Sequence, residues 1–87
     1  EHRGDVYTED ALGFALLRAG ELTEAKVHLD RATRLGTQDA SLLFHRGALH
    51  LAEGERGPGE ALLRAALALN PAFNLDGAQE ARRLLGL

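Results

Sequence analysis

The chain of 87 residues contains no cysteine, no methionine and no tryptophan. Without cysteine it can form no disulfide, no thiolate nucleophile and no thiolate metal site. No apolar run approaches the roughly 18 residues that a membrane-spanning helix requires. An excess of positive charge is also missing, because 10 Lys and Arg face 13 Asp and Glu, for a net charge of −3. Nucleic-acid binding needs a basic surface. We therefore expect neither a membrane nor a nucleic acid as partner.

The sequence also lacks the motifs of catalytic and cofactor chemistry. No Gly-rich segment is followed by Lys-Ser/Thr, and Ser41 has no base at a recognisable spacing. His45 and His50 are five residues apart, whereas a metal-binding pair on one helix face is three or four residues apart. We also expect no cluster of acidic residues to complete a site with these histidines. The sequence predicts no enzyme, no cofactor and no metal site.

Glu1, rather than a methionine, opens the chain. We therefore expect a fragment of a longer protein. The compartment stays open, because a cysteine-free domain occurs in any of them.

What the chain does contain is an internal repeat of 34 residues. Shifted by this length, the sequence matches itself at eight positions without a gap. The pairs are Asp5/Asp39, Gly13/Gly47, Leu17/Leu51, Gly20/Gly54, Glu21/Glu55, Leu29/Leu63, Ala32/Ala66 and Leu35/Leu69. A period of this size indicates repeated helix–turn–helix units. We expect one domain over 1–87, with repeat one at 6–39, repeat two at 40–73 and a capping helix at 76–85.

The apolar spacing is helical throughout and predicts an all-α chain of about five helices. The expected ranges are 6–19, 24–35, 40–53, 58–69 and 76–85. The expected N-caps are Asp5, Thr23, Asp39 and Asp76, the last in a capping box with Gln79, and Pro58 is expected at the first position of the fourth helix. The glycines expected to end helices are Gly20, Gly36, Gly54 and Gly86. Since the connections are short, neighbouring helices must run antiparallel.

The two units resemble tetratricopeptide repeats over residues 6–73, and the fifth helix resembles the closing helix of that family. The residues at the family's positions are Leu12, Gly13, Ala15, Gly20, Ala25, Leu29 and Ala32 in the first unit, and Gly47, Gly54, Leu63, Ala66 and Pro71 in the second. Departures from the pattern are Glu9 and Leu43 in place of an aromatic residue, Arg46 in place of a leucine and Gly59 in place of an alanine. The resemblance implies antiparallel hairpins stacked as a short right-handed α-solenoid.

Small residues should set the distance between paired helices. We expect Gly13 and Ala15 to face Ala25 and Ala32, since small side chains at a crossing let helix axes approach closely. The leucines expected to fill the seam are Leu12, Leu16 and Leu29. The segment 55–59, rich in glycine, is expected to be the loosest turn.

The resemblance implies a protein–protein interaction scaffold that binds a protein or peptide on a concave face, formed by the first helix of each repeat. The candidate groove residues are Tyr7, Asp10, Phe14, Leu17 and Arg18, then Ser41, Phe44, Ala48 and Leu51, then Ala78, Arg82 and Leu85. Packing against a neighbouring helix is the alternative role for the same side chains. The alternative function is self-association, which would make the isolated domain a homodimer.

Overall fold

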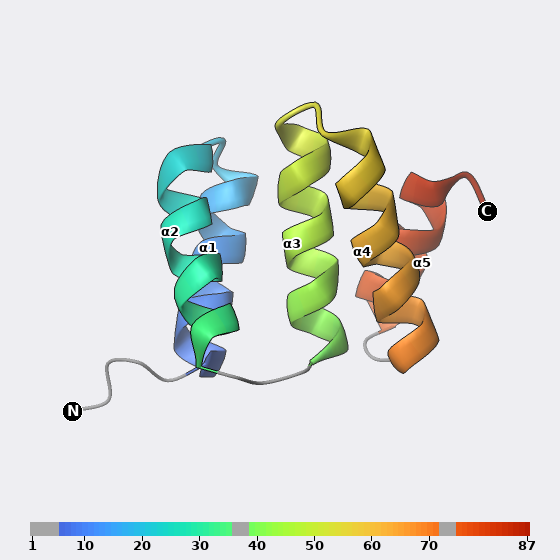
Figure 1. Cartoon of the computed structure of the whole chain (residues 1–87), viewed down its shortest axis with the longest axis horizontal. Coiled ribbons are helices and arrows are strands. Elements are labelled where there is room, and N and C mark those ends of the chain that lie inside the picture. The colour runs from blue at the N-terminus through green and yellow to red at the C-terminus, as the bar shows by residue number, and fades with distance from the viewer. Residues whose placement is uncertain (1–5, 36–38, 72–74) are drawn as a thin grey trace. The chain divides into compact units, whose positions relative to one another are not determined.

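A computed structural model describes residues 6–35, 39–71 and 75–87. Five α-helices form these segments: α1 Val6–Arg18, α2 Leu22–Arg34, α3 Ala40–Ala52, α4 Arg56–Leu69 and α5 Leu75–Leu85 (Figure 1). No strand occurs within the described segments, so the all-α class and the five helices are confirmed. None of these helices is both long enough and apolar enough to span a bilayer.

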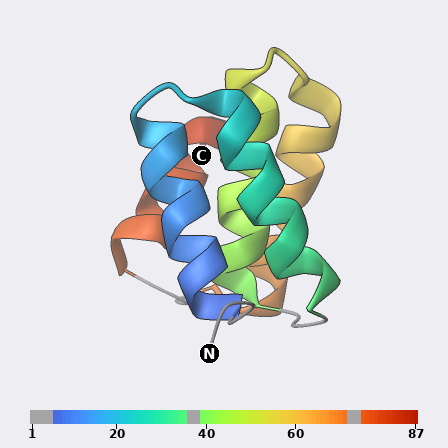
Figure 2. The same cartoon turned by 90° about the vertical axis from the view of Figure 1, so that its left-hand side faces the viewer.

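The helices belong to two compact units, residues 1–38 and 39–87. In the first unit α1 packs against α2, and Figure 2 shows the two helices joined by a short turn and running antiparallel. In the second unit α3 packs against α4, and α5 packs against α4 with a smaller contact to α3. The division between Gln38 and Asp39 lies one residue before the predicted repeat boundary.

In the first hairpin, α1 and α2 approach each other closely at Gly13. A Cβ atom at this position would lie 2.7 Å from Cγ and Cδ2 of Leu29 and 3.3 Å from the carbonyl oxygen of Ala25. Leu29 is 1% exposed, and Ala25 and Ala32 are 0% exposed. The absence of a side chain on Gly13 therefore lets Leu29 occupy the space between the helices. The predicted packing of Gly13 against Ala25 and Leu29 is confirmed, and Ala32 is buried.

Two other residues predicted for this seam lie outside it. Leu12 is 43% exposed and Ala15 is exposed. Successive residues of a helix are about 100° apart, so Ala15 lies about 200° around α1 from Gly13 and points away from α2. The prediction was wrong for both residues, because Gly13 is the residue of this turn of α1 that faces α2.

The second hairpin has a closer crossing, at which two glycines meet. A Cβ on Gly47 would lie 2.9 Å from the carbonyl oxygen of Gly59 and 2.9 Å from Cδ2 of Leu63. A Cβ on Gly59 would lie 2.9 Å from Cδ2 of Leu51. Gly59 therefore belongs to α4 and is buried at the crossing, where the first hairpin has Ala25.

The two hairpin turns have the same backbone geometry. Gly20 has φ 83° and Gly54 has φ 82°, the left-handed region that favours glycine. In each turn the amide of the next residue donates to a carbonyl five residues back, with Glu21 N to Leu16 O and Glu55 N to His50 O both at 2.8 Å. This 6→1 bond is the Schellman helix ending. The predicted roles of Gly20 and Gly54 are confirmed, while Gly36 lies outside the described residues.

Only one of the predicted N-caps that the structure describes is present. The Asp39 carboxylate accepts a hydrogen bond from the amide of Ser41 at 2.8 Å, so Asp39 caps α3 as predicted. Thr23 does not cap α2, because that helix begins at Leu22, with Glu21 in the cap position and no side-chain bond. Asp5 lies outside the described residues.

The starts of α4 and α5 also differ from the prediction. Since α4 begins at Arg56, Pro58 is its third residue and not its first. The missing N–H of Pro58 still breaks no helical hydrogen bond, because the amides of the first turn have no partner within the helix. Asp76 is the second residue of α5 rather than its N-cap, so the predicted capping box with Gln79 was wrong. The end of α5 at Leu85 is confirmed, and Gly86 has φ 81°.

Helix α5 contributes small side chains to the core of the second unit. Ala78 is 2% exposed and Ala81 is 0% exposed, at a spacing of three that gives one helix face. On its exposed side, Arg83 donates from Nε to Glu80 Oε1 at 3.0 Å. That hydrogen bond, with the charge of the same carboxylate, raises the pKa of the Arg83 guanidinium above its ordinary value.

Candidate functional site

The candidate groove residues of the first unit lie on α1. Phe14 is half-buried, and the guanidinium of Arg18 lies 5.3 Å from the centre of its ring, a cation–π contact. Leu17 is half-buried and Asp10 is 8% exposed. Tyr7 belongs to α1, but its side chain lies outside what the structure describes. Phe14 and Leu17 are therefore partly exposed and Arg18 is exposed on α1.

The candidates of the second unit are more buried. Phe44 is 4% exposed, and its ring lies 5.2 Å from that of His45. Leu51 is half-buried against Gly59, where it fills the seam between α3 and α4. Ala48 is half-buried. Packing within the unit therefore accounts for much of the surface of Leu51.

The remaining candidates are split between exposed and buried positions. Arg82 is exposed and donates from Nη2 to the carbonyl oxygen of Pro71 at 2.8 Å. Ser41 and Leu85 are half-buried, whereas Ala78 is buried in the core of the second unit. The structure describes each set of candidates within its own unit. A single groove that contains both sets stays a prediction.

A polar cluster links α1 to α2 in the first unit. Glu9, at 9% exposed, lies with Oε1 2.6 Å from His28 Nδ1 and with Oε2 3.9 Å from Arg31 Nη1. Glu9 occupies the position where the family pattern has an aromatic residue, and its partners compensate for the burial of a carboxylate. No serine or threonine nucleophile accompanies the three side chains in these contacts. The cluster is suited to holding the two helices together.

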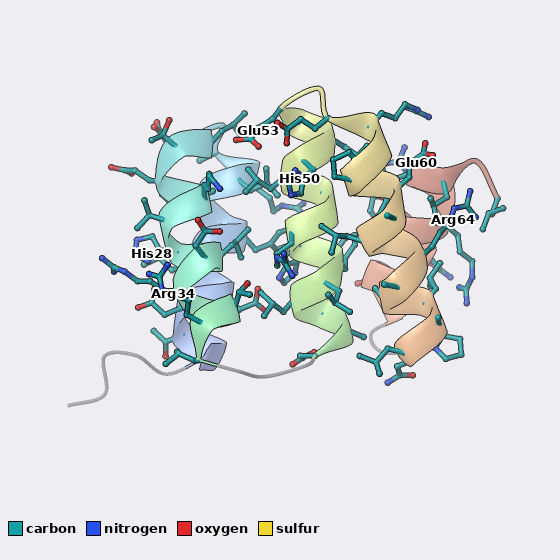
Figure 3. The ribbon with its side chains drawn as sticks, viewed as in Figure 1. His28, Arg34, His50, Glu53, Glu60 and Arg64 are labelled. Atoms are coloured by element: carbon teal, nitrogen blue, oxygen red, sulfur yellow. The ribbon has the colours of Figure 1, made fainter. Side chains whose placement is uncertain are left out.

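A second cluster lies at the turn between α3 and α4. His50, Glu53 and Glu55 each offer a ligand atom, and these atoms all lie within 4.8 Å of one another. His50 Nδ1 is 2.5 Å from Glu55 Oε1. Figure 3 shows His50 and Glu53 near the C-terminal end of α3. We expected no acidic cluster to complete a site with His45 and His50, but two glutamates do lie beside His50.

Sequence reasoning missed this cluster because helical spacing alone does not bring Glu55, which lies beyond the end of α3, back beside His50. The signal is the pattern His50-x-x-Glu53-Gly54-Glu55, in which the helix-ending glycine reverses the chain. This reversal brings Glu55 back beside the last turn of α3. The expected helix ending at Gly54 already implies this reversal, so the sequence held the signal that brings the three side chains together.

Comparison of the chain with known protein families, with curated proteins and with solved structures finds no match. The function is therefore argued from the residues and geometry of the two units.

Proposed function

We propose that the chain is a protein–protein interaction scaffold of the tetratricopeptide-repeat kind. The main support is the equivalence of the two hairpins. Gly13 meets Leu29 in the first hairpin as Gly47 meets Leu63 in the second, 34 residues later in each case. The turn glycines have φ values of 83° and 82°. Two hairpins of such similar design favour a repeat architecture.

Helical-hairpin repeats act by stacking, because each hairpin alone leaves part of its apolar surface uncovered. In this proposal the hairpins form a short right-handed solenoid, and the first helices of the repeats line its concave face. A segment of a partner protein binds along that face. The function needs no catalytic group, and the proposal assigns none.

Phe14, Leu17 and Arg18 are the residues of α1 that this function would use first. Phe14 and Leu17 present partly exposed apolar surface, and Arg18 presents a cation beside it. A partner segment with one bulky apolar anchor next to an acidic residue fits this chemistry, since aromatic and arginine side chains dominate interface energetics. Arg18 is already positioned over Phe14, so its side chain loses little conformational entropy when a partner binds.

A displayed library of random peptides, selected on the untagged chain, tests the proposal. We expect enriched peptides with an apolar anchor, and a Kd raised about tenfold or more by Arg18→Glu, as for an interface hot spot. Arg64→Glu is the matched control, because Arg64 is an exposed arginine on α4 and the substitution makes the same change of charge. A selection without enrichment would contradict the proposal. So would peptides whose affinity falls equally with Arg18→Glu and Arg64→Glu.

Self-association is the second candidate, and an exposed face of α1 favours it. Thr8, Ala11, Leu12 and Ala15 are all exposed and follow one another at the three- and four-residue spacing of a helix face. Two copies could cover this face with each other. Sedimentation equilibrium of the isolated chain then shows a dimer that Leu12→Glu dissociates. A monomer at all concentrations would leave the scaffold as the only candidate.

A further inference from the structure

We propose that the turn between α3 and α4 binds one divalent transition-metal ion, represented by Zn²⁺, through His50, Glu53 and Glu55. An imidazole nitrogen and carboxylate oxygens are ligands that Zn²⁺ accepts in proteins. Three protein ligands leave the fourth position of a tetrahedral ion to water. A purely acidic cluster would suit Mg²⁺ or Ca²⁺, whereas the imidazole of His50 favours a transition metal.

The distances in the cluster are close to those that an ion requires. Tetrahedral coordination with bonds of about 2.0–2.1 Å separates the ligand atoms by roughly 3.3–3.4 Å. His50 Nδ1 and Glu55 Oε1 are closer than this, at 2.5 Å, and the whole set lies within 4.8 Å. Small side-chain rotations therefore suffice to fit an ion: they would move His50 Nδ1 and Glu55 Oε1 apart and bring the Glu53 carboxylate closer to both. The side chain of Glu55 is 53% exposed and Glu53 is exposed, so both can rotate.

The backbone holds the three ligands on one turn. Glu53 is the C-cap of α3, and its amide donates to the carbonyl oxygen of His50 at 3.1 Å. Beyond Gly54, the amide of Glu55 donates to the same carbonyl at 2.8 Å. Ligands fixed in this way lose less conformational entropy when an ion binds. The C-terminal end of a helix also carries partial negative charge, which favours a cation.

Other charges leave the cluster available to a cation. Arg56, the first residue of α4, pairs with Glu60 of the same helix at 2.9 Å. The side-chain carboxylate of Glu53 makes no hydrogen bond or ion pair with any residue that the structure describes. The cluster therefore combines two carboxylates with a single imidazole. A bound cation would compensate the negative charge of the two carboxylates.

The chain contains its own control for this site. The equivalent positions of the first turn, 34 residues earlier, are Leu16, Ala19 and Glu21. That turn has the same left-handed glycine and the same hydrogen bond of 2.8 Å. It retains one carboxylate but has neither the imidazole nor the second carboxylate. The ligand set is thus specific to the second hairpin, and one ion per chain is expected.

Titration of the untagged chain with ZnCl₂ by isothermal calorimetry tests the proposal, in a buffer free of chelators. We expect one Zn²⁺ per chain, and NMR shifts concentrated on residues 49–56. Removing an outer-shell partner of a metal ligand typically lowers metal affinity 10–100-fold. Because His50 and Glu53 are proposed as the ligands themselves, His50→Gln and Glu53→Gln should each lower the affinity for Zn²⁺ at least as much. Glu21→Gln is the matched control and should change nothing. Circular dichroism shows whether each variant keeps its helices, and Glu53→Gln, at an exposed position, is the variant least able to disturb the fold.

Three results would overturn the proposal. They are the absence of saturable binding, an affinity unchanged by Glu53→Gln and His50→Gln, and NMR shifts centred on His28 or His45. A gain of function tests the role of the turn directly. The double substitution Leu16→His with Ala19→Glu recreates the ligand set in the first turn beside Glu21. We expect this variant to bind a second Zn²⁺, and a folded variant that binds only one would contradict the role given to the turn.

Discussion

Gly47 and Gly59 face each other across the crossing of α3 and α4, each against the backbone of the other. A Cβ on Gly47 would lie 2.9 Å from the carbonyl oxygen of Gly59, and a Cβ on Gly59 would lie 3.0 Å from that of Gly47. Real Cβ atoms essentially never lie within 3.0 Å of a non-bonded heavy atom, and a contact at 3.0 Å is already unusually close. The second hairpin therefore depends on two missing side chains.

Gly47→Ala should destabilise the chain although alanine is the better helix former. The helix gains about 1 kcal/mol from the substitution, but the added methyl group pushes α3 away from α4, which typically costs 1–3 kcal/mol. The neighbour in the way is backbone and cannot rotate aside, so we expect the larger cost. A change of 1 kcal/mol moves the melting temperature of a domain this size by about 4–8 °C. Thermal melts followed by circular dichroism measure the effect.

Gly57→Ala is the comparison for that experiment. Gly57 has no atom within 4 Å of its Cβ position and no positive φ, so the methyl group meets no other helix. It does precede Pro58, whose ring disfavours the helical conformation for a preceding residue with a Cβ. We therefore expect the gain in helix propensity to be offset, with stability within about 0.5 kcal/mol of the parent chain. Equal melting temperatures for Gly47→Ala and Gly57→Ala would show that the glycine crossing is not tight.

Asp39→Ala should cost about 1 kcal/mol, the usual effect of losing an N-cap. The cause is the hydrogen bond of 2.8 Å from the amide of Ser41, which the variant lacks. Thr23→Ala makes a change of similar size at the residue expected to cap α2. Thr23 lies inside α2, so its replacement by alanine should be neutral or slightly stabilising. Urea unfolding of the two variants distinguishes the cap from the helical residue, and a greater loss for Thr23→Ala would contradict this assignment.

Glu9 and His28 should be energetically coupled. Their contact of 2.6 Å joins α1 to α2, with side chains only 12% and 21% exposed. A double-mutant cycle with Glu9→Ala and His28→Ala should give a coupling of about 1.5–3 kcal/mol, the range of hydrogen bonds to charged groups. The control cycle uses Lys26 and Asp30, 3.3 Å apart but 57% and 47% exposed. That pair should contribute about 0.3–0.5 kcal/mol. Equal couplings would show that burial does not strengthen the Glu9 contact.

Phe44 and Phe14 should respond differently to truncation. Phe44 is 4% exposed, so Phe44→Ala should cost about 3–5 kcal/mol, the typical value for a buried aromatic side chain. Phe14 is half-buried, so the loss of its apolar contact should cost about half as much or less. Urea unfolding measures both values. A small effect for Phe44→Ala would contradict the burial of Phe44 in the core of the second unit.

The starts of α2 and α4 show where local sequence rules fall short. Thr23 and Pro58 are good helix-start residues by type, yet the helices begin at Leu22 and Arg56. The Schellman turns place Glu21 and Glu55 at the boundary, and the carbonyl of each accepts the first helical bond, from Ala25 at 2.9 Å and from Gly59 at 3.1 Å. The matched pair Glu21/Glu55 in the repeat marks these starts better than the cap propensities do.

For the candidate site, too, some features follow from the sequence and others depend on packing. Placement of Phe14, Leu17 and Arg18 on α1 follows from helical spacing, because it depends only on residues within one helix. The burial of Phe44 and the contact of Leu51 with Gly59 do not follow from spacing, since both depend on a packing partner. A residue's type and helical face indicate what it can contact, but only the neighbouring helix determines how much surface stays exposed.

By itself the sequence determined the five helices, the small residues Gly13 and Ala25 of the first seam and the glycine turns at Gly20 and Gly54. These features are local, because they depend on helical periodicity and on the φ angle that glycine alone adopts easily. Tertiary structure alone decided that Gly59 faces Gly47 and how deeply Phe44 is buried. Both depend on how neighbouring helices pack against each other, which the periodicity within a single helix does not specify.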